Sequence, residues 1–335
     1  MALISLRYDL RTAPDSIGGV GHDALYRTAL DQTRWADRLG IDIVTVSEHH
    51  VTEQGFLPSP VVLAAALATA TERIAISIAA LLAPLHHPVR LAEDLAVLDH
   101  LAGGRVSVVL GLGYRPEELA LFGVESGNRV ALVEECVAVL RLAWTGEPFE
   151  FRGQTVSVRP RPLTPGGPML LLGGSVPASA RRAARLGLPF FPSIDDPELV
   201  RIYTEDNERL GRPPGFCSLP KGPVFVHVSD DPERDWERIA PHALADATTY
   251  RSWQAAGNRS IAESQATSVD DLRAEGKYLV LTPDECVALI ETYDPFQGFV
   301  LHPLMGGIDP DLSWASLELF AAKVLPRVRP PATGA

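Results

Sequence analysis

Apolar and polar positions follow two patterns along the chain, short apolar runs and longer stretches with helical spacing. A short apolar run predicts a buried strand, whereas apolar residues three and four positions apart predict an amphipathic helix. Residues 22–39 show the helical pattern, and Gly40 follows as a C-terminal stop. In the first half the pattern predicts strands at 3–8, 41–47, 74–80 and 106–111, and helices at 22–39, 58–71, 88–101 and 128–144.

The second half continues the alternation less regularly, with strands predicted at 169–173, 189–191, 223–228 and 298–301 and helices at 177–186, 197–210, 232–244, 283–293 and 312–324. Eight strands, each followed by a helix, favour an α/β fold of the parallel (β/α)8 type, a TIM barrel. We expect one barrel domain over residues 1–330 and a disordered tail at 331–335. No G-x-G-x-x-G motif follows the first strand, which weakens the alternative of an open dinucleotide-binding sheet.

Two stretches interrupt the barrel pattern. Residues 149–158 alternate around a glycine-containing turn, which predicts a hairpin insertion that a proline-rich run closes by residue 168. Residues 248–282 are polar and predict one long loop. A loop of that length in a barrel is usually functional, so we expect a lid over the carboxyl ends of the strands.

The composition excludes several classes of protein. Hydrophobic residues make up 46% of the 335 positions, yet no apolar run is long enough to span a membrane, and the N-terminus does not resemble a secretory signal. A net charge of −12 disfavours nucleic acid and anionic membranes as partners. The three cysteines are widely spaced, which argues against a disulfide framework or a zinc site. We therefore expect a cytoplasmic protein without a structural metal.

Histidines follow two consecutive predicted strands. Glu48, His49 and His50 come directly after the second strand, and His86 and His87 follow the third. Barrel enzymes carry their chemistry at the carboxyl ends of the strands, so these groups are expected at one shared rim. Glu48, His49, His50 and His87 are the catalytic candidates. A structural imidazole remains the alternative for His50 and is favoured for His86.

A second rim element suits a phosphate group. Residues 172–179 read LGGSVPAS and run from a predicted strand into a predicted helix. Small residues let a phosphate approach the backbone, the start of the helix offers free N–H groups, and Ser175 and Ser179 add hydroxyl donors. Such a turn is a weak signal alone, but phosphate sites recur in the later loops of barrels.

Three stretches together resemble one family. Residues 48–56 read EHHVTEQGF, residues 79–94 read AALLAPLHHPVRLAED, and residues 98–105 read LDHLAGGR. This combination closely resembles bacterial luciferase and the luciferase-like flavin-dependent monooxygenases. The resemblance is strongest over residues 40–124, and residues 317–326 also look like the closing helix of the family.

The resemblance implies a barrel that uses reduced FMN and O2 without a metal. It implies that His49 assists proton transfer near a flavin C4a-(hydro)peroxide, and that the peptide bond between Ala79 and Ala80 is cis and packs against the flavin ring. It also matches Ser175 to a phosphate-contacting serine and His87 to a family position of less certain role. The candidate cofactor-binding residues are Ala79, Ala80, Gly111, Gly113, Tyr114, Gly173, Gly174, Ser175 and Ser179.

Three positions depart from luciferase. Gly111 replaces a cysteine near the flavin, Leu112 replaces the arginine that meets the phosphate, and Gly174 replaces a glutamate. Phosphate affinity would then come from Ser175, Ser179 and either Arg181 or Arg182. We therefore expect weak FMN binding and dependence on a separate flavin reductase, and light emission is not predicted.

Three function classes follow from the resemblance. The favoured one is a flavin-dependent monooxygenase acting on a small organic or natural-product substrate. The second is an oxidoreductase that uses the deazaflavin coenzyme F-420 for hydride transfer, which the excess of arginine over lysine makes plausible through a GC-rich genome. The third, a non-catalytic flavin-binding protein, is disfavoured by the histidine rim. Luciferase-like proteins tend to associate through helices of the second and third βα units, so the resemblance, with the small apolar residues at 61–70, implies a homodimer. A helix that is simply buried on the barrel is the alternative for this stretch.

Overall fold

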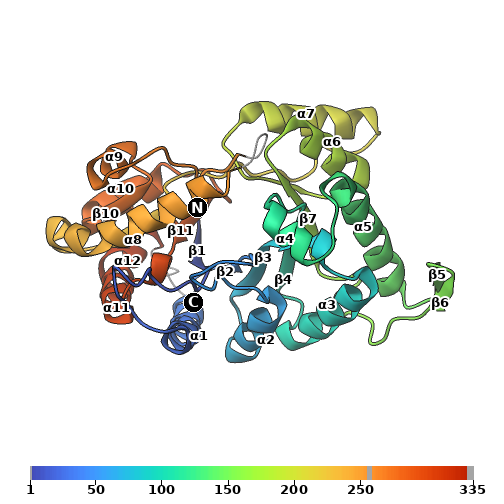
Figure 1. Ribbon diagram of the computed structural model, residues 1–335, viewed down its shortest axis with the longest axis horizontal. Helices are drawn as coiled ribbons and strands as arrows, with labels where there is room; N and C mark the ends of the chain where they lie inside the picture. Colours follow the sequence, from blue (N-terminus) through green and yellow to red (C-terminus); the bar gives the residue numbers. More distant parts are fainter. Residues whose placement is uncertain (1, 255–258, 330–335) are drawn as a thin grey trace, which may run out of the picture.

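A computed structural model describes residues 2–254 and 259–329. Its centre is a seven-stranded parallel sheet in the order β11-β1-β2-β3-β4-β7-β8, which curls into a half-barrel with helices on its outer side (Figure 1). The strands are β1 (Leu3–Tyr8), β2 (Ile43–Val46), β3 (Ala75–Leu82), β4 (Val106–Gly111), β7 (Met169–Gly174), β8 (Phe190–Pro192) and β11 (Gly298–Leu301). The tail predicted at 331–335 lies outside the described residues.

Parallel pairing brings the carboxyl ends of these strands to one edge. Tyr8 at the end of β1 pairs with Val46 at the end of β2, and Val46 pairs in turn with Ile78 of β3. Residues that follow these strands therefore emerge side by side. This register places the predicted histidine rim at a single end of the sheet.

The helices cover the outside of the strands. Several begin with proline at the first helical position, where its missing N–H costs nothing, and α1 ends at Gly40, whose φ of 75° is left-handed. The α-helices are α1 (His22–Leu39), α2 (Pro60–Ala70), α3 (Pro88–Ala102), α4 (Pro116–Leu121), α5 (Arg129–Thr145), α6 (Pro177–Leu186), α7 (Pro197–Arg209), α8 (Pro232–Ser252), α9 (Val269–Glu275), α10 (Pro283–Glu291), α11 (Pro310–Leu319) and α12 (Leu325–Val328). Short 3₁₀ turns occupy Ala83–Leu85, Ser126–Asn128 and Met305–Gly307, and Phe320–Val324 is π-helical.

A polar chain crosses the otherwise apolar core and ties β1 to two helices. The hydroxyl of Tyr8 donates to Gln32 of α1 at 3.0 Å, and the amide of Gln32 donates to Ser313 of α11 at 2.5 Å. All three side chains are fully buried. Because each buried polar group has a partner, the chain fixes these elements without the cost of an unpaired donor.

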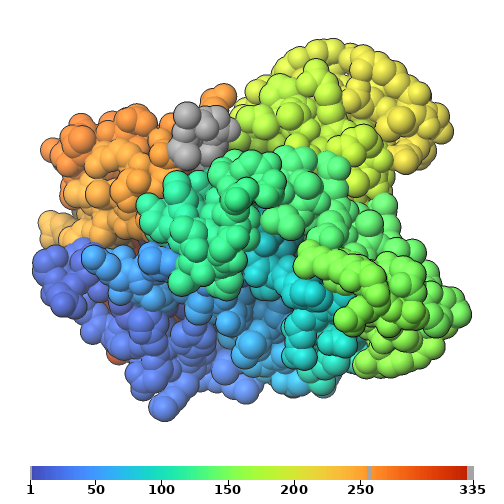
Figure 2. Space-filling view, turned by 45° about the vertical axis from the view of Figure 1, so that its right-hand side comes forward, coloured from blue at the N-terminus to red at the C-terminus, as the bar shows by residue number. Residues whose placement is uncertain are grey.

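Two smaller sheets complete the fold. β5 (Phe149–Phe151) and β6 (Gln154–Val156) pair antiparallel at the outer edge of the molecule. β9 (Phe225–Val228) and β10 (Tyr278–Leu281) form a separate parallel pair. In the space-filling view the yellow segment that contains α7 projects from the body of the molecule (Figure 2). No helix in the described part of the chain is both long and apolar enough to cross a membrane.

The prediction of one long loop at 248–282 is wrong. Helix α8 continues to Ser252, the capping box of Ser268 and Asp271 starts α9, and β10 pairs with β9. Two local signals were present in the sequence. One is a Ser-x-x-acid pattern at the start of α9, and the other is the apolar run of β10.

Candidate active site

A cavity of about 580 Å³ opens at the carboxyl ends of the strands. Its size falls in the range of small-molecule and cofactor sites. Most residues singled out from the sequence line it, and these are Glu48, His49, Ala79, Ala80, Gly111, Gly113, Tyr114, Gly173, Gly174, Ser175 and Ser179. His50 and His87 are not among the residues that line it.

His49 is held from below and enclosed by aromatic rings. Its Nδ1 lies 2.9 Å from Oε1 of Glu118. Its ring lies edge-on to Phe56 and Tyr114, with centroids 4.7 and 5.9 Å away, and is tilted against Trp253 at 5.0 Å. Glu118 thus fixes the orientation of the imidazole, and the three aromatic rings around it limit its contact with water.

Glu118, on the short helix α4, is a functional candidate that the sequence interpretation missed. Its carboxylate is fully buried and accepts from the backbone N–H of His50 at 2.9 Å and from Arg115 at 3.2 Å. Burial acts to raise the pKa of Glu118, but the contacts with His49, His50 and Arg115 outweigh it and lower the pKa. An ionised Glu118 accepts a hydrogen bond from Nδ1–H of His49, which leaves Nε2 without a hydrogen in the neutral imidazole.

Arg115 completes this support. It donates to the carbonyl oxygen of His50 at 2.6 Å, and its guanidinium lies 4.2 Å above the ring of Trp253. One arginine therefore links α4, the loop after β2 and the end of α8. The signal for α4 was a short acidic segment, Pro116-Glu117-Glu118, which no periodicity separates from a surface turn.

Glu48 acts as an acceptor for two imidazoles. Its Oε1 lies 3.0 Å from Nε2 of His50 and 2.8 Å from Nε2 of His86, and its Oε2 accepts from the N–H of Leu82 at 2.6 Å. Burial acts to raise the pKa of Glu48, but the hydrogen bonds from His50 and His86 lower it to about 2. Both carboxylate oxygens of Glu48 are therefore engaged, and His50 is directed to Glu48 and not into the cavity.

His87 does not reach the cavity, contrary to the expectation of a catalytic role. It is exposed at the start of α3, where its ring lies edge-on to Phe151 of β5 at 5.6 Å. The two adjacent histidines point to different sides because His86 ends a 3₁₀ turn and His87 precedes the helix.

The middle of the cavity has a floor with few side-chain atoms. The peptide bond between Ala79 and Ala80 is cis, as predicted. A Cβ added at Gly111 would lie 3.1 Å from the Cβ of Ala80, and one at Gly173 would lie 3.2 Å from Val109. Because Gly111 and Gly173 have no side chain at these strand ends, this surface of the cavity stays flat. A flat surface suits a planar ring.

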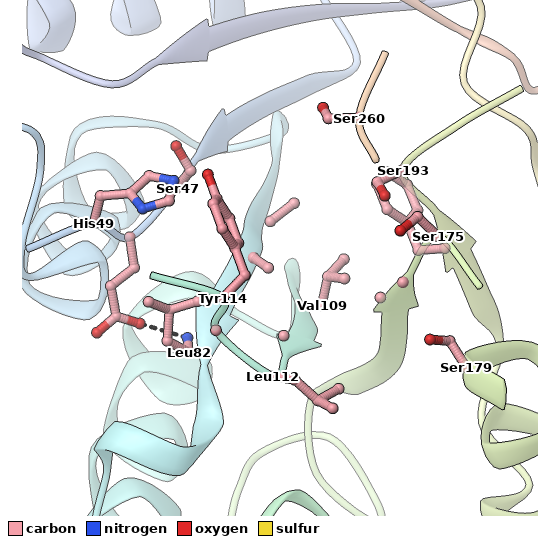
Figure 3. Close-up of a pocket in the computed structure, with 18 of the residues that line it drawn as sticks. Ser47, His49, Leu82, Val109, Leu112, Tyr114, Ser175, Ser179, Ser193 and Ser260 are labelled. Atoms are coloured by element: carbon pink, nitrogen blue, oxygen red, sulfur yellow. Dashed lines mark hydrogen bonds between the residues drawn. The ribbon is translucent and has the colours of Figure 1, made fainter. Parts of the chain in front are cut away.

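The opposite end of the cavity is rich in hydroxyl groups. Ser175 and Ser179 flank the start of α6, and Ser193 and Ser260 line the cavity beside them. Figure 3 shows this serine group facing His49, Ser47 and Tyr114 across Val109 and Leu112. Ser175 accepts from the backbone N–H of Arg259 at 3.1 Å, so its own hydroxyl hydrogen stays available to a ligand.

The arginines expected at this end are not the ones that the structure places there. Arg182 pairs with Glu134 at 3.5 Å, and Arg181 is exposed on α6, so neither lines the cavity. Arg259 lines it instead, next to the serine group. Its backbone carbonyl accepts from Ser193 at 2.9 Å. No local pattern predicts this contact, because it depends on how residues 259–261 pack beside the end of β8.

The two ends of the cavity and its floor together fit a flavin that carries a phosphate group. Hydroxyl donors and the start of a helix suit a dianion, and Arg259 and Arg129 are also among the residues that line the cavity. The flat floor suits a planar ring, and an enclosed imidazole stands at the far end. Within the described residues no group of three or more His, Cys, Asp or Glu side chains is arranged to hold a metal ion.

Comparisons with known proteins agree with this arrangement. The chain matches the family model described as luciferase-like monooxygenase over residues 9–295. It is 26% identical over 328 residues to a 4-hydroxyprotoasukamycin monooxygenase of Streptomyces nodosus subsp. asukaensis, a match that covers 89% of this chain and 85% of that protein. An alkanal monooxygenase alpha chain of Photorhabdus laumondii is 31% identical over 165 residues, which cover 48% of this chain and 46% of that protein.

Solved structures give the same result over nearly the whole length. A monooxygenase of Streptomyces bottropensis aligns with a TM-score of 0.76 at 26% identity, covering 97% of this chain and 99% of that chain. The oxygenating constituent of 3,6-diketocamphane monooxygenase of Pseudomonas putida, in complex with FMN, aligns at 0.70 and 20% identity, covering 99% and 100%. An F-420-dependent secondary alcohol dehydrogenase aligns at 0.70 and 19% identity, covering 98% and 99%.

The last two likenesses show a shared fold alone, and they include one protein in complex with FMN and one that depends on F-420. The family match covers most of the chain and includes β2 to β10, whereas β1 and β11 lie outside it. From this match and the monooxygenase relatives, we conclude that this chain belongs to the luciferase-like monooxygenase family and is an oxidoreductase.

Proposed function

We propose that this chain is a monooxygenase that uses reduced FMN and O2 on a small organic or natural-product substrate. The observation that carries the proposal is one cavity with three matched parts. A buried His49–Glu118 pair stands at one end, a floor of Ala79, Ala80 and Gly111 lies in the middle, and the serine group lies at the other end. The separation of these parts along the cavity suits a flavin whose phosphate and ring are held by different residues.

The chain's own residues would hold the cofactor as follows. Ser175, Ser179 and Arg259 would bind the phosphate, and the floor would support the ring. When bound, reduced FMN would supply the electrons that activate O2. The rings of Phe56, Tyr114 and Trp253 around His49 would exclude water from the reacting centre, which protects oxygen-derived species from wasteful breakdown.

His49 would transfer the proton. Glu118 fixes the hydrogen on Nδ1, so Nε2 is the nitrogen that faces reactants. A positioned imidazole contributes about 10²- to 10⁴-fold to a rate that depends on proton transfer. We also propose weak FMN binding and delivery of reduced FMN by a separate reductase. The supporting observation is Leu112, which lines the cavity without offering a charge.

A deazaflavin-dependent hydride transfer is the alternative, and one observation favours it. Arg259 and Ser260 line both the main cavity and a neighbouring hollow that also includes Lys277. A coenzyme with a longer tail than FMN would extend from the serine group into this hollow. Arg259 and Lys277 there are matched by Glu263 and Glu275, so the support for this alternative is the position of the hollow and not its charge.

Cofactor binding separates the two proposals. The chain is titrated with FMN and with F-420 by difference absorption, and photoreduced FMN is then mixed with O2 in the presence and absence of the chain. We expect saturable FMN binding and slower release of hydrogen peroxide than from free reduced FMN. Saturable binding of F-420 with no FMN binding would establish the alternative instead.

We further propose one barrel domain and a homodimer. The β9–β10 pair would complete the barrel wall beside β11, which β9 contacts. Apolar side chains stay exposed on two neighbouring helices, with Val62 of α2 72% exposed and Leu101 of α3 45% exposed. Such residues suit an interface between two copies. A sedimentation mass equal to one chain of 36.2 kDa at micromolar concentration would contradict the dimer.

A further inference from the structure

An arginine lines the end of the cavity next to His49. Arg7, near the end of β1, is half-buried and pairs in register with Thr45, two residues before Ser47. Its guanidinium donates one hydrogen bond, to the phenol oxygen of Tyr250 on α8 at 2.8 Å. A guanidinium carries five N–H donors, so most of its donor capacity is unused by this contact.

The nearby carboxylates are occupied by a different arginine. Arg11 pairs with Asp9 at 3.1 Å and also pairs with Asp246, and His302 lies 3.4 Å from Asp9. Within the described residues Arg7 forms no ion pair. Burial acts to lower the pKa of Arg7, but Tyr250 and Asp9 outweigh it and raise the pKa. Arg7 is therefore a charged donor without a carboxylate partner of its own.

Two hydroxyl groups beside it are also without an acceptor. The Oγ of Ser47 is buried and has no hydrogen-bond partner among the described residues, and Ser47 lines the cavity. Tyr250 accepts from Arg7, so its own O–H remains free to donate. A buried donor left unpaired is costly, which indicates that a ligand satisfies it.

Acceptors are scarce at the same end. Glu48 is the one carboxylate among the described residues that line the cavity. Its oxygens already form hydrogen bonds with His50, His86 and the N–H of Leu82. Nε2 of His49 is left as the one basic atom, because Nδ1 faces Glu118. This end thus combines spare donors, one positive charge and one base.

We propose that the substrate of this enzyme presents an acidic hydroxyl, a phenol or an enol, and that Arg7, Tyr250 and Ser47 bind its oxygen in the ionised form. His49 is placed to take the proton from that hydroxyl through Nε2, which leaves imidazolium and an oxyanion with no change in oxidation state. The oxyanion then pairs with the Arg7 guanidinium. An electron-rich, ionised ring or enolate is a suitable carbon nucleophile for oxygenation. The role of the acidic hydroxyl in the reaction therefore rests on the proposed function, whereas its binding can be tested without that function.

The probe is 4-nitrophenol, because its ionised and neutral forms have different absorption spectra. It is titrated with the chain across pH, with and without FMN, and 4-nitroanisole serves as the matched ether that cannot ionise. A charge-assisted hydrogen bond is worth about tenfold to a hundredfold in affinity. We therefore expect the phenolate form to bind about tenfold or more tightly than the phenol, which lowers the pKa of the bound probe by about one unit or more.

Variants assign the effect to Arg7. Arg7→Met should abolish the pKa shift of the bound probe, Arg7→Lys should retain part of it, and Tyr250→Phe should reduce it. Ser175→Ala, at the other end of the cavity, should leave the shift unchanged while it weakens FMN binding. An unchanged or raised pKa of the bound probe, or equal affinity for 4-nitroanisole, would overturn the inference, as would absence of saturable binding.

The same titrations separate this inference from the proposed function. Loss of FMN binding with a retained phenolate shift would refute the FMN proposal and keep the acidic-hydroxyl site. Normal FMN binding without a shift in the pKa of the bound phenol would refute the acidic-hydroxyl site and keep the FMN proposal.

Discussion

Oε1 of Glu118 lies 2.9 Å from Nδ1 of His49, although the two residues are 69 positions apart in the chain. A helix of only six residues, α4, brings the carboxylate under the imidazole. The pair therefore depends on the connection between β4 and α5 as much as on the histidine itself. A carboxylate in this place sets which ring nitrogen carries the hydrogen and steadies the imidazolium when it forms.

Replacing His49 tests the proton-transfer role. His49→Ala should lower turnover by about 10²- to 10⁴-fold while the affinity for FMN changes little, because the phosphate is held at the opposite end of the cavity. Single-turnover rates with saturating reduced FMN give the first quantity, and calorimetry gives the second. A rate within a few-fold of the unmodified enzyme would remove His49 from the mechanism.

Replacing Glu118 tests whether it acts through His49. Glu118→Gln removes the charged acceptor, and loss of one charge-assisted hydrogen bond corresponds to about tenfold to a hundredfold in rate. The pH–rate profile should also shift, because a neutral amide does not stabilise imidazolium. The matched control is Glu117→Gln, an exposed neighbour on the same helix. Equal profiles for the two variants would show that Glu118 is only structural.

The residues proposed to bind the FMN phosphate can be tested through the affinity for FMN. Ser175→Ala and Arg259→Ala should each weaken FMN binding, and Leu112→Arg should strengthen it, by about tenfold or more where a charge is involved. Arg181→Ala, exposed on α6, is the control. Calorimetry of the four variants is decisive. Unchanged affinity in Ser175→Ala and Arg259→Ala would place the phosphate elsewhere or favour the longer deazaflavin coenzyme.

Acid should destabilise the fold through Glu48. Its pKa in the folded chain is about 2, below its ordinary value of 4.5, so its stabilisation is present above pH 4.5 and is lost as the pH falls toward 2. Between pH 5 and pH 3.5 this carboxylate accounts for a loss of about 1 kcal/mol in the free energy of unfolding.

Urea unfolding at several pH values measures this loss. Glu48→Gln should lose about 1 kcal/mol less than the unmodified chain over the same interval. Glu53→Gln, on an exposed loop position, should behave like the unmodified chain. A parallel pH dependence in all three proteins would mean that Glu48 does not carry the effect.

Local patterns predicted the regular elements well and the site only in part. β1, α1, β4, α6 and β11 lie at the predicted residues, because each has a clear apolar pattern and all but β1 also have a glycine or proline at one end. β10 was missed because four apolar residues inside a polar segment, directly after Gly276, are too short a signal.

Side-chain partners were the part that local pattern could not supply. The adjacency of Glu48 to His49 and His50 in sequence suggested one catalytic group, but the structure divides it. Glu48 binds His50 and His86, while His49 turns to Glu118. Which carboxylate meets which imidazole depends on the packing of α4 and the loop after β3, and that packing involves residues far apart in the chain.

Trp253 gives the site a built-in optical signal. Its indole lies 5.0 Å from the ring of His49 and 4.2 Å below the guanidinium of Arg115. A charge that forms on His49, or a ligand that displaces either neighbour, changes the electrostatic environment of the indole directly. The emission of this one tryptophan should therefore report filling of the cavity and protonation of His49 in real time, with Trp253→Phe as the blank, before any substrate or product has been identified.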